Sequence, residues 1–322
     1  MARGQVVKLD RGYPLVQLED GTRVRCEHAT GMVKGSDVRA VIGDEVEVAL
    51  PDGHAVGIIE AVASRRCELV RKDPTDRAQA QVLAANFDRV VIVQALGEVN
   101  LRRLERELVL AAETGASVDV VLTKADQAEG RDEVARVSRA VQALAGDACS
   151  VLVVAAGDAA SLEPVRALLA PGTTTILLGR SGVGKSTLVN SLMGATVQAT
   201  GSVRATDGKG RHTTVSREVV ALPNGARIVD MPGVRGLGLW EADAGIGAAF
   251  ADVEELAQGC RFRDCTHGAE PSCAVRAAVE SGALAPERYE SYRALKKETA
   301  DIRERREQAR WQQSDRRRGK KR

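Results

Sequence analysis

Residues 179–186 read Gly179-Arg180-Ser181-Gly182-Val183-Gly184-Lys185-Ser186, between an apolar run at 174–178 and a helical pattern that begins at Thr187. The pattern is G-x-x-x-x-G-K-S, in which glycines let backbone N–H groups turn inward around phosphate groups. The start of the following helix adds partial positive charge. Lys185 is expected to pair with the β- and γ-phosphates, and Ser186 is expected to bind Mg²⁺. The stretch from Gly179 to Thr187 therefore predicts a nucleotide site with Mg²⁺ as its cofactor.

The sequence around this loop alternates between apolar runs and helical patterns. Apolar runs occupy residues 89–94, 118–123, 151–155 and 174–178, and helical patterns occupy residues 101–114, 131–144 and 162–169. Continuous apolar strands between helices are typical of a parallel sheet covered on both faces. We predict an α/β P-loop domain over residues 75–239.

Two further segments favour a GTPase over a kinase. Asp230-Met231-Pro232-Gly233 follows an apolar run and fits D-x-P-G, in which Asp230 would reach Mg²⁺ through water and the Gly233 amide would sense the γ-phosphate. Between the two motifs, residues 210–214 read Gly-Arg-His-Thr-Thr. Thr213 and Thr214 are both candidates for the switch threonine that completes the Mg²⁺ shell.

The segment Thr123-Lys124-Ala125-Asp126 resembles the guanine-reading motif N-K-x-D. Asp126 is expected to accept hydrogen bonds from guanine N1 and N2, which adenine cannot offer. Thr123 replaces the usual asparagine; its hydroxyl can still tie this segment to the phosphate loop, although loss of the amide is expected to weaken nucleotide affinity. Residues 154–157 correspond to the S-A-x loop beside the base, with alanine in place of serine.

The order of these motifs is that of a circularly permuted GTPase. The base reader at residue 126 precedes the phosphate loop at residue 179, whereas an ordinary GTPase has the opposite order. The chain then leaves the domain near residues 234–238, directly after the γ-phosphate sensor. Whatever follows is tethered to an element that moves on hydrolysis.

The first 70 residues predict a small all-β domain. Short alternating runs at 5–9, 14–18, 23–26, 45–49 and 55–62 are separated by turn signals such as Asp20-Gly21 and Asp52-Gly53. Five strands at this spacing suit an OB-like barrel that binds RNA, and an SH3-like barrel would give much the same pattern.

The C-terminal part predicts a small helical metal domain over residues 240–300. Helical patterns occupy residues 248–256, 273–281 and 286–312, and the first two flank Cys260, Cys265, His267 and Cys273. Three thiolates and an imidazole form a closed tetrahedral set, which predicts one structural Zn²⁺. The other cysteines, Cys26, Cys67 and Cys149, are scattered and are predicted to be small buried hydrophobes.

Composition and charge favour a cytoplasmic protein with an anionic partner. The net charge is +2, but residues 301–322 carry ten Lys/Arg against four Asp/Glu. This basic tail, predicted to be disordered from residue 316, suits either an RNA contact or a solvated end. No apolar run is long enough to cross a bilayer, so no membrane partner is expected.

The combined motifs resemble the small-subunit-dependent ribosome biogenesis GTPase family RsgA, also called YjeQ or YloQ. The resemblance rests on the β-barrel, the permuted order, G-R-H-T-T, D-M-P-G-V-R and C-x₄-C-x-H-x₅-C, and it covers nearly the whole chain. It implies a cytoplasmic GTPase that acts late in 30S subunit maturation, binds 16S rRNA and is stimulated by the 30S subunit. We expect a monomer that binds GTP and GDP.

His212 is the expected catalytic residue. Val234 stands where many GTPases have a water-orienting side chain, and His212 in the switch segment is the best local substitute, with an rRNA contact as its alternative role. Competing functions are a P-loop ATPase or nucleotide kinase, a nucleic-acid-binding module with a degenerate GTPase fold, and a permuted GTPase of the large subunit.

Overall fold

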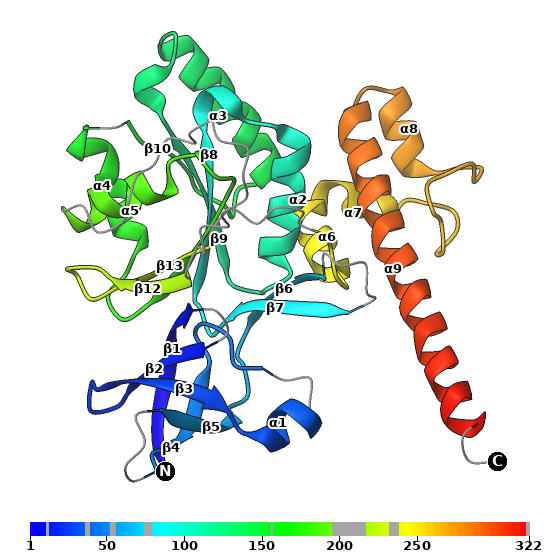
Figure 1. The fold of residues 1–322 in the computed structure, drawn as a ribbon. Coiled ribbons are helices and arrows are strands. Elements are labelled where there is room, and N and C mark those ends of the chain that lie inside the picture. Colours follow the sequence, from blue (N-terminus) through cyan, green and yellow to red (C-terminus); the bar gives the residue numbers. More distant parts are fainter. Residues whose placement is uncertain are drawn as a thin grey trace, which may run out of the picture. The chain divides into compact units, whose positions relative to one another are not determined.

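The computed structural model describes residues 1–10, 13–35, 39–51, 56–73, 79–155, 157–194, 217–231 and 238–319 (Figure 1). Contacts divide the chain into two compact units. The first comprises residues 1–69, 82–99 and 116–235, and the second comprises residues 70–81, 100–115 and 236–322. The predicted domain boundaries stay a prediction: residues 1–69 share the first unit with most of residues 75–239, and residues 75–81 and 100–115 fall in the second unit.

The N-terminal strands of the first unit form a closed barrel. The elements are β1 (Ala2–Asp10), β2 (Tyr13–Leu18), β3 (Arg23–His28), α1 (Thr30–Gly35), β4 (Glu45–Ala49) and β5 (Gly57–Val62). β1 pairs with β2 and β4, β3 pairs with β2 and β5, and β4 pairs with β5. This circuit, with a helix between β3 and β4, is OB-like, which confirms one of the two predicted topologies.

The barrel has its own apolar core, and two of the scattered cysteines are buried as predicted. Val6, Val16, Val48 and Ile59 are fully buried around Cys26. Cys149 is buried elsewhere in the first unit.

Cys67 departs from this prediction. It is only half-buried, and its thiol donates a hydrogen bond to the carbonyl oxygen of Phe87 at 3.0 Å.

The remaining part of the first unit is an α/β sheet with strand order β10-β9-β8-β11-β13-β12. Its elements are β8 (Arg89–Ala95), η1 (Leu96–Glu98), β9 (Ser117–Thr123), η2 (Ala125–Gln127), α3 (Arg131–Ala145), β10 (Val151–Val153), α4 (Ala159–Leu168), β11 (Thr174–Leu178), α5 (Lys185–Met193), β12 (Arg217–Ala221) and β13 (Arg227–Asp230). The pairs from β10 to β13 are parallel, as the apolar runs predict, and β12 pairs antiparallel with β13. α3, α4 and α5 contact these strands.

The barrel and this sheet are continuous within the first unit. β1 pairs antiparallel with β12 at Lys8↔Glu218 and Leu9↔Arg217. The Lys8 ammonium and the Glu218 carboxylate form an ion pair across this junction at 2.7 Å. The barrel is therefore attached to the strand that follows the segment containing residues 210–214.

The second unit is mainly helical. It contains α2 (Leu101–Ala112), α6 (Asp243–Ala249), α7 (Ala251–Ala257), α8 (Ala274–Glu280) and α9 (Pro286–Gly319). β6 (Glu68–Lys72) and β7 (Ala80–Ala85) form a two-stranded sheet, and residues 70–81 of this segment also belong to the second unit. The long helix continues to Gly319 rather than ending at Gln312, so the predicted disorder from residue 316 is corrected for residues 316–319.

α2 is held in the second unit by buried polar contacts. The Glu105 carboxylate is 4% exposed and pairs with Arg288 of α9 at 3.3 Å. Glu113 accepts a hydrogen bond from the backbone N–H of Gly245 at 2.5 Å, at the start of α6. These contacts explain why a helix that follows β8 in sequence packs with the C-terminal helices.

Candidate functional site

Three of the predicted site segments follow parallel strands of one sheet. Thr123 ends β9, Gly179 follows β11, and Asp230 ends β13. β9, β8, β11 and β13 are neighbours and run parallel. Their carboxyl ends therefore share one edge, which is where open α/β sheets bind ligands.

The phosphate loop adopts a backbone that its glycines permit. Gly179 and Gly184 have positive φ values of 145° and 100°. A Cβ atom at Gly179 would lie 2.4 Å from the carbonyl oxygen of Val93, so a larger residue would displace the backbone. α5 begins at Lys185, directly after Gly184, so the N–H groups of its first turn face the loop.

The Lys185 ammonium lies inside this loop. The residue is 6% exposed, and its Nζ donates hydrogen bonds to the carbonyl oxygens of Gly179 at 2.8 Å and Arg180 at 3.0 Å. A buried cation enclosed by backbone at a helix N-terminus is suited to a phosphate group.

The Asp230 carboxylate is half-buried beside the phosphate loop. Burial raises its pKa, and the nearby Lys185 charge and a hydrogen bond with Ser186 oppose that rise. Its Oδ1 atom is buried and has no hydrogen-bond partner among the described residues. A buried carboxylate oxygen beside a serine hydroxyl is a donor set that suits Mg²⁺, because Mg²⁺ prefers oxygen ligands.

Thr123 joins the base-reading segment to the phosphate loop. Its side chain is buried, and its hydroxyl donates to the carbonyl oxygen of Val183 in a short contact. The carbonyl oxygen of Gln94 lies 3.1 Å from the same hydroxyl. The tie expected from the sequence is present.

The residues after Thr123 turn sharply and lie beside the second base loop. Lys124 has a left-handed backbone, with φ 58° and ψ 31°, and its ammonium is 3.4 Å from Glu98. The Ala125 N–H donates to the carbonyl oxygen of Val154 at 3.2 Å. Asp126 is exposed directly after this turn. The Glu98 partner was not foreseen, because sequence spacing gives no signal for it.

Five predicted residues lie outside the described part of the chain. They are His212, Thr213, Thr214, Gly233 and Ala156. Their roles stay predictions.

A second site in the second unit gathers four soft metal ligands. The ligand atoms of Cys260, Cys265, His267 and Cys273 all lie within 4.8 Å of one another. His267 Nδ1 is 3.6 Å from Cys260 Sγ and 3.4 Å from Cys273 Sγ, and the two sulfurs are 3.9 Å apart. Ligands around a tetrahedral Zn²⁺ stand about 3.5–3.8 Å apart at ordinary bond lengths. The cluster could therefore bind one metal ion.

Hydrogen bonds to the surrounding loop hold the histidine in place. His267 has a positive φ of 57°. Its carbonyl oxygen accepts from the Tyr289 hydroxyl at 2.5 Å, and Glu270 accepts from the backbone N–H groups of Thr266 at 3.0 Å and Gly268 at 2.7 Å. Sequence reasoning missed Tyr289 and Glu270. The one sequence signal for Glu270 was its position between the ligands His267 and Cys273.

Among the described residues, none of the helices combines the length and apolarity that crossing a bilayer requires.

Comparisons with known proteins point to one family. The sequence profile of the family described as RsgA GTPase matches residues 62–240. A protein of Streptomyces coelicolor named small ribosomal subunit biogenesis GTPase RsgA is 42% identical over 300 residues, which cover 93% of this chain and 81% of that protein. The crystal structure of YjeQ from Thermotoga maritima is 27% identical, with a TM-score of 0.65 over 90% of this chain and 95% of that one. The fold also matches YloQ, a circularly permuted GTPase, with a TM-score of 0.64 at 24% identity over 95% of this chain and 96% of that one.

Proposed function

Because this chain belongs to the RsgA GTPase family and is a GTP hydrolase, we propose that it acts in late maturation of the 30S ribosomal subunit, binding 16S rRNA and hydrolysing GTP with stimulation by that subunit. The observation that carries the proposal is the set of Lys185, Asp230 and Thr123 at one sheet edge, where Lys185, Thr123 and the Oδ1 atom of Asp230 are buried. The 42% identity to a relative named for small-subunit biogenesis supports the choice of partner.

Each described residue at this edge has a proposed task. Lys185 leaves its two carbonyl partners to bind the β- and γ-phosphates, and Asp126 accepts hydrogen bonds from guanine. Ser186 and, through water, Asp230 would hold Mg²⁺. When bound, this ion neutralises charge on the phosphate oxygens. Thr213 or Thr214 completes its shell, and Gly233 senses the γ-phosphate.

We assign hydrolysis to His212, which would orient the attacking water when the 30S subunit docks. The assignment rests on sequence position, since residue 234 is a valine. His212→Ala should abolish subunit-stimulated turnover and leave GTP binding intact. Stimulated turnover that persisted in this variant would return His212 to an rRNA-contact role.

The remaining parts have supporting roles in this proposal. The metal in the cluster would be Zn²⁺, a choice supported by three thiolates and one imidazole at these separations. The OB-like barrel and the basic end of α9 would contact rRNA. The protein would work as a cytoplasmic monomer.

The decisive experiment is GTP turnover with and without purified 30S subunits, with 50S subunits as the control and Lys185→Ala as the inactive enzyme. Stimulation by 30S subunits alone supports the proposal. Stimulation by 50S subunits would point to a large-subunit factor, and no turnover with either would point to a degenerate binding module. Equal affinities for GDP and ADP would contradict guanine recognition.

A further inference from the structure

The Thr123 hydroxyl has more acceptors around it than protons to give. It faces the carbonyl oxygens of Val183 and Gln94, which both only accept hydrogen bonds. A hydroxyl carries one proton, whereas the amide of an asparagine carries two. The proton of Thr123 is therefore used within the protein.

The surroundings keep the hydroxyl in this position. Thr123 is 5% exposed and is the last residue of β9. A Cβ atom built on Gly184 would lie 3.2 Å from the Thr123 Oγ1 atom, so the phosphate-loop backbone packs directly against this side chain. Rotation toward a bound base would break the contact with Val183 and leave a buried carbonyl unpaired.

Guanine has both hydrogen-bond donors and acceptors, and these need different partners in the Thr123–Asp126 motif. Guanine presents N–H donors at N1 and N2, and acceptors at O6 and N7. A carboxylate such as Asp126 can serve only the donors. An acceptor such as N7 needs an N–H or O–H group, and Thr123 has none left to offer.

The backbone N–H of Ala155, in the neighbouring base loop, is not a free donor for N7 either. The backbone N–H of Ala155 donates to the Ser161 hydroxyl at 3.2 Å. The Lys124 ammonium is directed to Glu98.

We propose that this site reads guanine through its N1 and N2 donors and that none of its described residues reads N7, so that its substrate class extends to guanine nucleotides that lack N7. Thr123 is a positioning residue that ties the base reader to the phosphate loop. This inference rests on the proposed guanine recognition by Asp126.

The test compares the dissociation constants of the full-length protein for GDP, 7-deaza-GDP and inosine diphosphate. We expect GDP and 7-deaza-GDP to bind within about twofold of each other, because no hydrogen bond is lost at position 7. Inosine diphosphate lacks the N2 amino group and should bind about tenfold more weakly or worse. A tenfold loss for 7-deaza-GDP would overturn the inference.

The same panel separates this inference from the proposed function. Equal binding of GDP and inosine diphosphate would contradict the role of Asp126 in guanine recognition, whatever the 7-deaza result. A normal inosine penalty with a large 7-deaza penalty would contradict only the unread N7.

Variants of Thr123 test its role directly. Thr123→Ser keeps the hydroxyl and should keep the wild-type ratio of the dissociation constants for GDP and 7-deaza-GDP. Thr123→Val removes the tie and should weaken GDP and 7-deaza-GDP about equally; a loss confined to GDP would mean that Thr123 touches N7. Thr123→Asn adds a second donor and should create a preference for GDP over 7-deaza-GDP of about threefold to tenfold. An unchanged ratio in that variant would mean that a donor at residue 123 does not reach N7, which would contradict this explanation of the unread N7. If the variant does not bind, Thr123→Val decides.

Discussion

Glu298 of α9 accepts two hydrogen bonds from the Arg106 guanidinium of α2, at 2.8 and 2.7 Å. The same carboxylate lies 3.3 Å from the backbone N–H of Leu239, in the chain that follows Asp230 and β13. The Glu298 side chain thus joins the long C-terminal helix both to α2 and to the first residues of the segment 236–322.

This pair should contribute measurably to the stability of the second unit. Two parallel hydrogen bonds between charged groups that are about one-third exposed are worth about 1 kcal/mol. A double-mutant cycle with Arg106→Ala and Glu298→Ala should show that coupling in the free energy of unfolding. Both tryptophans, Trp240 and Trp311, lie in the second unit, so fluorescence follows its unfolding.

The control is the Arg102–Glu290 pair, which joins the same two helices. Its side chains are 72% and 66% exposed at 3.3 Å, so its coupling should be near zero. Equal coupling in the two cycles would show that burial and bidentate geometry do not matter here.

Removal of the metal should destabilise the second unit. Cys273 is buried with its sulfur 3.4 Å from His267 Nδ1, so Cys273→Ala deletes one of four ligands. We expect loss of bound metal, measured by elemental analysis, and a lower midpoint in the tryptophan-detected unfolding curve. A strong chelator should reproduce the effect on wild type.

Cys149→Ala is the matched control, because Cys149 is a buried cysteine of the first unit, whereas the cluster belongs to the second. It should keep one metal ion per chain. Full metal content in Cys273→Ala would remove this cysteine from the ligand set.

The features that could be predicted from the sequence are those encoded by local patterns. The phosphate loop was predictable because its glycines and Lys185 work through backbone next to them in the chain. The barrel strands were predictable from short alternating runs. The Thr123 tie was predictable because the motif fixes its partner loop.

The packing of α2 was not predictable. Its apolar period indicates that one face is buried but does not identify the partner, and the contacts that decide, such as Glu113 with Gly245, join residues far apart in the chain. The end of α9 was also misjudged, because basic residues after Gln312 are compatible with both a helix and a tail. Long-range choices of this kind depend on tertiary contacts.

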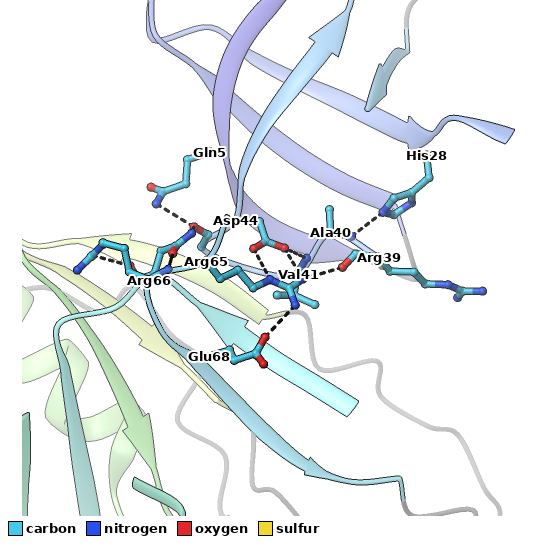
Figure 2. Close-up of polar contacts among 11 residues, drawn as sticks. Gln5, His28, Arg39, Ala40, Val41, Asp44, Arg65, Arg66 and Glu68 are labelled. Carbon is cyan, nitrogen blue, oxygen red and sulfur yellow. Dashed lines mark hydrogen bonds and ion pairs between the residues drawn. The ribbon is translucent and has the colours of Figure 1, made fainter. Parts of the chain in front are cut away.

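The ion pair between Asp44, just before β4, and Arg65, just after β5, should be sensitive to loss of one partner. Asp44 is fully buried and accepts from Arg65 at 2.8 and 2.9 Å and from the Val41 N–H at 2.7 Å (Figure 2). Arg65→Ala leaves this carboxylate without its cation, which should cost about 3–5 kcal/mol. Thermal unfolding followed by circular dichroism would measure the loss.

Glu68→Ala is the comparison for this pair. Glu68 contacts the same guanidinium at 3.1 Å but is 44% exposed, so its removal should change the stability by less than about 1 kcal/mol. If the two variants were equally stable, the buried carboxylate would not depend on Arg65.

His28 should make the barrel less stable in mild acid. Its Nε2 atom accepts a hydrogen bond from the Ala40 N–H at 3.0 Å, which requires the neutral ring (Figure 2). Burial lowers the pKa of His28 below its ordinary 6.5, and the charge of Arg39 lowers it further. The unfolded chain therefore binds the proton more readily, so this contribution is complete above about pH 7 and is lost as pH falls through 6.5 toward the folded pKa.

His28→Gln provides the reference, because glutamine can accept the bond but does not titrate. The difference in unfolding free energy between wild type and this variant should be constant above about pH 7. Below that pH, the unfolding free energy of wild type should fall relative to that of the variant. A difference that stayed flat from pH 8 to pH 5 would contradict the assignment.

Asp230 should lower the stability of the protein without bound Mg²⁺ while being required for GTP turnover. Its Oδ1 atom is buried and unpaired among the described residues, and burial raises the pKa of Asp230, so the charge opposes folding when no cation is bound. Asp230→Asn removes the charge and keeps the shape, and we expect it to raise the melting temperature in chelator by about 2–4 °C while lowering GTP turnover at least about a hundredfold. Asp158→Asn, at the exposed start of α4, should change neither quantity, because asparagine caps a helix as well as aspartate. A lower melting temperature for Asp230→Asn would mean that the carboxylate stabilises the fold, and its burial would then need no explanation from Mg²⁺.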